Sequence, residues 1–250
     1  MKKICLLMSM MLMISAVVQA QIADKKTYLA DMVAEMHKKW PDNRTLNIVF
    51  HGHSVPTGYF SGQEVHTFES YPHYMHYSLK EMFPYAVINC IRTSIGGETA
   101  RKGAQRFASD VLPHKPDLLF IDYSLNDRAL SLEEARSCWA SMIESALENN
   151  TKVILCTPTP DTTEDITDDA APLAAHAEQV RELAETYHVG LVDSYALFKA
   201  KALAGENISR YMSQNNHPNA QGHRLVADEI LTWFTSLSVE TEGDFVDSGI

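Results

Sequence analysis

Short apolar runs alternate along this chain with longer segments in which apolar residues recur at helical spacing. The strand-like runs are residues 46–51, 85–91, 117–123, 152–157 and 189–193. The helix-like segments are residues 70–82, 98–109, 131–149, 171–187 and 219–236, with a shorter one at 194–203. Such alternation predicts a parallel sheet with helices on both faces, because each parallel connection has to cross back over the sheet. We therefore expect one α/β domain, a three-layer α/β/α sandwich around a five-stranded parallel sheet.

The two ends of the chain depart from this pattern. Lys2 and Lys3 precede the apolar stretch 4–18, and small residues follow at Val18-Gln19-Ala20. These features are typical of a secretory signal peptide and predict a periplasmic or extracellular protein. The expected division is a signal peptide (1–20), an N-terminal helical segment (21–45), the α/β domain (46–237) and an acidic tail (238–250).

The charge of the chain limits its partners. The net charge is −11, and it is −13 without residues 1–20, which carry two lysines and no acid. A surface this acidic repels phosphate backbones and anionic lipid headgroups. We therefore expect no nucleic-acid partner and no membrane insertion after signal cleavage.

Cysteines and histidines offer little sign of a metal site. Cys90, Cys138 and Cys156 follow the signal, and an odd number leaves at least one thiol unpaired within the chain. We expect buried free thiols, since no Cys-x-x-Cys pair points to zinc. His73 and His76 have the i, i+3 spacing of a shared metal ion, but no spacing supplies a third ligand. Surface or hydrogen-bonded histidines are the expectation, with no metal.

Ser54 stands where the first apolar run ends in a small-residue turn, Gly52-His53-Ser54. Open α/β folds place reactive groups at the carboxyl ends of their strands. A serine hydroxyl becomes a good nucleophile only when a neighbouring base takes its proton. Ser54 is therefore a candidate nucleophile, and the alternative is a serine that caps a loop.

Three later segments hold further candidates. Ser94-Ile95-Gly96-Gly97-Glu98-Thr99 follows the second strand, and Ser124-Leu125-Asn126-Asp127 follows the third. Glycine lets a backbone N–H approach a ligand closely, and an asparagine amide donates hydrogen bonds, although both segments are also ordinary turn chemistry. His217-Pro218 precedes the last helix, and Gln214 lies three residues before the histidine.

The chain is similar to the SGNH branch of the GDSL hydrolases from about residue 46 to 236. The similarity rests on four sequence blocks, which contain, in this order, Ser54, Gly97, Asn126 and His217. The resemblance implies a flavodoxin-like sheet and a serine esterase without metal or organic cofactor. It also implies the roles: Ser54 attacks the acyl carbon and His217 takes its proton. The N–H groups of Ser54 and Gly97 and the amide of Asn126 would hold the oxyanion.

Three positions depart from the family. His53 and Ser124 replace an aspartate and a glycine, and Gln214 replaces the aspartate that normally orients the histidine. We expect Gln214 Oε1, or a backbone carbonyl, to orient His217 in a Ser-His dyad. The alternative is a degenerate site that binds without catalysis.

The expected function is a secreted serine esterase that hydrolyses short acyl esters, O-acetyl esters above all, on a small-molecule or glycan substrate. One alternative is a non-catalytic carbohydrate-binding protein on a degenerate hydrolase scaffold. Another is a short-chain lipase or thioesterase, for which Tyr59-Phe60 is the only apolar pair near the blocks. Arg92 and Arg128 flank the second and third blocks and would bind a carboxylate, sugar hydroxyls or a neighbouring acid.

Overall fold

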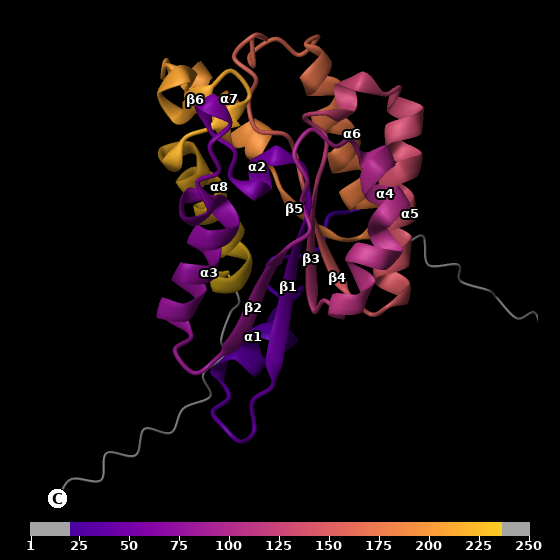
Figure 1. Cartoon of the computed structure of the whole chain (residues 1–250), viewed down its shortest axis with the longest axis vertical. Coiled ribbons are helices and arrows are strands. Elements are labelled where there is room, and N and C mark those ends of the chain that lie inside the picture. Colours follow the sequence, from indigo (N-terminus) through magenta and orange to yellow (C-terminus); the bar gives the residue numbers. More distant parts are fainter. Residues whose placement is uncertain (1–20, 237–250) are drawn as a thin grey trace, which may run out of the picture.

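Five parallel strands form one sheet in the order β2-β1-β3-β4-β5 (Figure 1). The strands are β1 Thr45–Gly52, β2 Val87–Arg92, β3 Leu118–Asp122, β4 Lys152–Cys156 and β5 Gly190–Val192. The computed structural model describes residues 21–236, and the predicted signal peptide and acidic tail lie outside the described residues. The expected five-stranded parallel sheet is confirmed.

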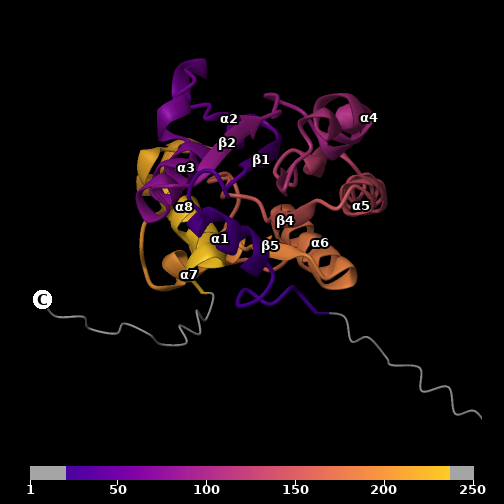
Figure 2. The same ribbon diagram turned by 90° about the horizontal axis from the view of Figure 1, so that it is seen from below.

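Helices cover both faces of the sheet, as Figures 1 and 2 show. One face packs against α1 Ala30–His37, α3 Tyr71–Met82 and α8 Ala220–Thr235. The opposite face packs against α4 Ala100–Asp110, α5 Leu132–Glu148 and α6 Pro172–Tyr187. The three-layer sandwich is confirmed, and α7 Ser194–Leu203 is the expected short helix.

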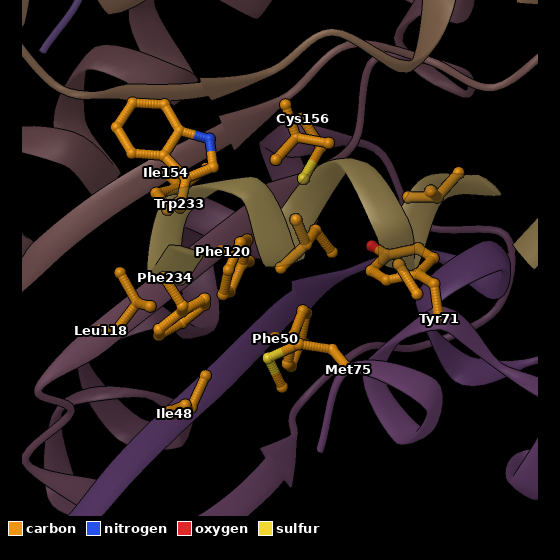
Figure 3. Close-up of a cluster of buried hydrophobic side chains, with 14 of the residues drawn as sticks. Ile48, Phe50, Tyr71, Met75, Leu118, Phe120, Ile154, Cys156, Trp233 and Phe234 are labelled. Carbon is orange, nitrogen blue, oxygen red and sulfur yellow. The ribbon is translucent and has the colours of Figure 1, made fainter. Parts of the chain in front are cut away.

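Successive side chains of each strand point to opposite faces of the sheet, so the core is divided into two clusters. Ile48 and Phe50 of β1 belong to the cluster under α3 and α8, whereas Val49 belongs to the opposite cluster. Phe50 stacks on Phe120 of β3 with ring centroids 4.5 Å apart (Figure 3). Side chains of successive strand residues point to opposite faces, so a strand buried on both sides is apolar throughout.

The cysteines agree with part of the expectation. Cys90, Cys138 and Cys156 all carry free thiols. Cys156 is buried in the cluster of Figure 3, whereas Cys90 and Cys138 are only partly covered. Burial nevertheless raises the pKa of the Cys90 thiol to about 12. These thiols are packing groups rather than reactive ones.

The elements that sequence periodicity missed are short, and those that hold Ser54 and His217 lie at one edge of the sheet. They include the four-residue helix α2, Ser54–Thr57, and an antiparallel hairpin of β6, Met212–Gln214, with β7, His217–Pro218. Both lie beyond the carboxyl ends of the parallel strands (Figure 1). From β1 the chain adds β2 on one side of the sheet and then β3, β4 and β5 on the other side. The switch point between β1 and β3 is where open α/β sheets bind ligands. Between residues 21 and 236, no helix has the length and apolarity that a bilayer span requires.

Candidate active site

The turn that carries Ser54 is built by the two residues before it. A Cβ on Gly52 would lie 2.4 Å from the Asp122 carbonyl oxygen, so only glycine lets β1 end this close to β3. His53 caps α2, because its Nδ1 accepts the Val55 N–H at 3.1 Å. Histidine thus supplies a capping acceptor at the position where the family has an aspartate. Ser54, the first residue of α2, is 8% exposed.

The other side of His53 faces a buried carboxylate. Nδ1 accepts the Val55 hydrogen bond, and the other ring nitrogen, Nε2, lies 3.3 Å from Oδ1 of Asp122. Asp122 also accepts a hydrogen bond from the Tyr71 hydroxyl at 2.8 Å. The side chain of His53 therefore points into the protein, and its backbone N–H holds the nucleophile turn against the end of β3 by donating to the Asp122 carbonyl at 3.2 Å.

His217 reaches Ser54 from the β6–β7 hairpin. Its Nε2 lies 2.8 Å from Oγ of Ser54. Ser213 on β6 donates its hydroxyl to the His217 carbonyl at 3.2 Å, and Asn219 caps α8 by accepting the N–H groups of Gln221 and Gly222. The histidine is thereby held between a hairpin and a helix start.

Gln214 contacts His217, but through a different atom from the one expected. The amide nitrogen Nε2, rather than Oε1, lies against Nδ1 of the histidine, and it also donates to Oδ1 of Asn216 at 3.3 Å. A donor at Nδ1 places the ring proton on Nε2, the nitrogen that faces Ser54. Rotating the carboxamide by 180° brings Oε1 onto Nδ1, which is the arrangement that a general base requires.

The imidazole of His217 is hard to protonate. Burial, followed by the nearby charge of His53, lowers its pKa to about 4, and Asp161 opposes this shift. Asp161 lies in the loop between β4 and α6, where Thr162 donates its N–H to the Asn215 carbonyl at 2.8 Å. No spacing rule pointed to Asp161, because the loop meets the hairpin only in the folded chain.

Three groups are the expected oxyanion donors. Gly97 adopts φ 78°, a conformation that favours glycine. The backbone N–H groups of Ser54 and Gly97 have no hydrogen-bond partner within residues 21–236. Asn126 donates one amide hydrogen to the Glu98 carbonyl at 2.9 Å, which leaves its second amide hydrogen free.

Asp127 fixes the turn that carries Asn126. Its carboxylate accepts the Ala100 N–H and the Trp139 indole N–H, each at 2.7 Å. Burial raises the pKa of Asp127 to about 6, although both hydrogen bonds act against this rise. In the third block, Asn126 thus supplies the amide, and the buried Asp127 carboxylate holds the turn in place.

Tyr59 forms a wall in front of the nucleophile. Its N–H donates to the Ser54 carbonyl at 3.1 Å, and its ring centroid lies 6.4 Å from that of His217. A Cβ on Gly96 would lie 3.1 Å from the ring. Tyr59 therefore spans the space between the Gly96-Gly97 turn and the base, whereas Phe60 is buried and stacks on His66.

The remaining candidates contribute little to the site. Arg128 pairs with Asp161 at 2.7 Å and also with Glu164, so its charge is used within the protein. Arg92 donates to the Thr67 carbonyl at 3.3 Å. His73 packs edge-on against Phe68, and no group of three potential metal ligands occurs in the described part of the chain.

Several solved structures share this fold. A two-domain esterase active on acetylated mannans superimposes with a TM-score of 0.69 at 22% identity, over 93% of this chain and 59% of that one. The acetyl xylan esterase AlAXEase gives 0.64 at 22% identity, over 75% and 98%. An acetylxylan esterase from Geobacillus stearothermophilus gives 0.66 at 21% identity, over 76% and 94%. This chain thus spans little more than half of the two-domain protein.

No curated protein matches the chain. A family model does: residues 50–225, which include Ser54, Gly97, Asn126 and His217, match the GDSL-like lipase/acylhydrolase family. This match agrees with the resemblance at the four blocks. The chain belongs to the GDSL-like lipase/acylhydrolase family.

Proposed function

We propose that this protein is a secreted serine esterase that removes short acyl groups, acetyl above all, from carbohydrate. The observation that carries the proposal is the 2.8 Å contact between Oγ of Ser54 and Nε2 of His217. A serine beside a neutral imidazole and free N–H donors is equipped for acyl transfer.

The first half of the reaction forms an acyl-enzyme. With the ring proton of His217 on Nδ1, Nε2 takes the proton of Ser54 as Oγ bonds to the ester carbonyl carbon. The N–H groups of Ser54 and Gly97 and the free amide hydrogen of Asn126 stabilise the oxyanion. Nε2 then returns its proton to the sugar oxygen as the ester C–O bond breaks, and the alcohol leaves.

Water completes the cycle. Nε2 of His217 takes a proton from water, whose oxygen bonds to the acyl carbon, and the same three donors hold the second oxyanion. The bond to Oγ then breaks, and His217 returns the proton to Ser54. Gln214 keeps the second ring proton on Nδ1 when its Oε1 faces that nitrogen, although a neutral amide stabilises the imidazolium less than a carboxylate does.

Two observations support an acetyl group on a glycan. Tyr59 limits the space beside Ser54, which favours a small acyl group. The three structural relatives act on acetylated mannans or are named acetyl xylan esterases. A signal peptide over residues 1–20 would bring the enzyme to such polymers in the periplasm or outside the cell.

Release of acetate from a panel of acetylated glycans tests this proposal. The wild-type protein should release acetate from at least one glycan, and the Ser54→Ala variant should release none above the blank. Acetylated mannan and xylan are the first substrates to compare. Hydrolysis of long-chain acyl esters but not of acetyl esters would point instead to a lipase or thioesterase.

One observation favours a second candidate, a protein that binds glycans without catalysis. The amide nitrogen of Gln214 at Nδ1 corresponds to the ring tautomer that cannot accept the Ser54 proton. If the amide never rotates, the site binds but does not react. Glycan binding that survives Ser54→Ala, with no turnover of any short acyl ester by the wild type, would establish this candidate.

A further inference from the structure

A hollow lies beside the turn that precedes the catalytic hairpin. It has a volume of about 410 Å³ and is lined by residues of α3, of the turn before β6 and of the start of α8. Tyr74, Arg210, Tyr211, Gln221 and Arg224 supply its polar and aromatic surface. No carboxylate lines it among the described residues, although the chain as a whole is strongly acidic.

Both guanidinium groups of this groove lie over aromatic rings. Arg224 Cζ is 3.8 Å from the centroid of Tyr74, and Arg210 Cζ is 5.3 Å from that of Tyr211. Stacking holds the plane of a guanidinium and leaves its edge N–H donors free for a planar acceptor. Glu206 lies 4.0 Å from Arg210 and accepts a hydrogen bond from the Tyr211 hydroxyl.

These two arginines differ from most others in the protein. Close pairs with a carboxylate are made by Arg44, Arg101, Arg106, Arg128, Arg136 and Arg181. The Arg224 guanidinium has neither an ion pair nor a hydrogen bond to any residue in 21–236. A pair of positioned and largely unused cations is suited to an anion from outside the chain.

The groove is rigidly joined to the catalytic base. Asn219 donates its side-chain amide to the Arg210 carbonyl at 2.8 Å and its N–H to the Tyr211 carbonyl at 2.9 Å. A Cβ on Gly222 would lie 2.3 Å from that Tyr211 carbonyl oxygen, so α8 starts directly against this turn. His217 and the groove residue Ala220 are three positions apart, which limits their Cα separation to about 11 Å.

We propose that this groove is a subsite for an acidic sugar, with Arg210 and Arg224 binding the carboxylate of a uronate unit near the acetylated residue. The proposal rests on the proposed function, since it assigns the substrate to acetylated glycans that carry carboxylates. Arginine forks bind carboxylates through paired N–H donors.

Kinetics on two acetylated oligosaccharides of equal length, one neutral and one with a uronate unit, test the subsite. The wild-type enzyme should have the higher kcat/KM on the uronate substrate. The double substitution Arg210→Gln, Arg224→Gln should lower that value by about tenfold or more, equivalent to about 1.4 kcal/mol. The change should lie in KM, and turnover of a small chromogenic acetyl ester should stay at the wild-type rate.

The control removes the same kind of charge elsewhere. Arg136→Gln on α5, across the sheet from the groove, should leave the preference for the uronate substrate unchanged. Equal effects of Arg136→Gln and the double substitution would mean that overall charge sets the preference, which overturns the subsite. Equal wild-type rates on the two substrates would overturn it as well.

A binding measurement separates this proposal from the proposed function. Ser54→Ala titrated with a deacetylated uronate oligosaccharide should bind it more tightly than the neutral one, whether or not the wild type is an esterase. The single variant Arg224→Lys, which keeps the charge but loses the planar fork, should bind it less tightly than its parent. Equal affinity for both oligosaccharides would exclude an acidic-sugar subsite even in an active esterase.

Discussion

Oγ of Ser54 lies 2.8 Å from Nε2 of His217, although 163 positions separate the two residues. They meet because β1 and the β6–β7 hairpin both lead to the carboxyl edge of the sheet. Ser54 is 8% exposed, and burial lowers the pKa of the His217 imidazole.

Ser54→Ala should abolish ester hydrolysis while leaving the fold intact. Base catalysis alone contributes about 10²–10⁴-fold, so losing the nucleophile should lower kcat on an acetyl ester at least that far. The matched control is Ser141→Ala on α5, whose hydroxyl donates to the Cys138 carbonyl. Residual turnover within tenfold of wild type would remove Ser54 from the mechanism.

Gln214→Ala should lower kcat less than His217→Ala does. Removing the base prevents activation of Ser54, whereas removing Gln214 leaves a fraction of correctly placed imidazole. Comparing kcat of the two variants on one acetyl ester is sufficient. Equal losses would mean that the amide is as necessary as the base, and no loss at Gln214 would assign the orienting role to a backbone carbonyl.

On its acidic side, the pH profile of kcat/KM should reach half of its maximum near pH 4. Only neutral imidazole accepts the Ser54 proton, and burial lowers the pKa of His217 to about 4 from an ordinary value of about 6.5. Activity should therefore rise through pH 4 and be level between pH 6 and 7. Gln214→Glu places a carboxylate at Nδ1, so the acidic half-maximum of its profile should move to higher pH. An acidic half-maximum of the wild type at pH 6.5 would contradict the burial of His217.

Tyr59→Ala should widen the range of acyl groups. A methylene that gains apolar space contributes about 0.8 kcal/mol, so the two additional carbons of a butyryl group predict a rise of about tenfold in butyryl over acetyl kcat/KM. Tyr59→Phe should keep the wild-type ratio, as should Phe68→Ala, which removes an exposed aromatic ring that is packed on His73. An unchanged ratio together with a higher KM for glycans would make Tyr59 a sugar platform instead.

The folded state should weaken in mild acid. Burial lowers the pKa of His51 and of His217 to about 4 and that of His223 to about 3. The unfolded chain binds these protons below about pH 6.5 and the folded chain does not, so stability is full above that pH and falls as the pH drops toward 4. The urea concentration at the midpoint of unfolding should be lower at pH 4.5 than at pH 7, and this difference should be smaller in His223→Phe. Equal midpoints of the wild type at the two pH values would refute the prediction.

Much of the fold follows from the sequence alone, because apolar periodicity is a local property. The segment 131–149 forms α5, Leu132–Glu148, which Ser131 caps by accepting the Glu134 N–H at 3.1 Å. Elements of two to four residues, such as α2 and β7, are too short to show a period. They carry Ser54 and His217, so residue chemistry rather than periodicity pointed to them.

The sequence by itself determined the parallel sheet, the order of the four blocks and the absence of an acid at position 214. Only the tertiary structure decided that the Gln214 carboxamide contacts Nδ1 of His217, how far burial lowers the pKa of that histidine, and that Arg128 is neutralised by Asp161. It also brought Arg210 and Arg224 to one groove. These properties arise from burial and from contacts between segments distant in the chain, which no local pattern records.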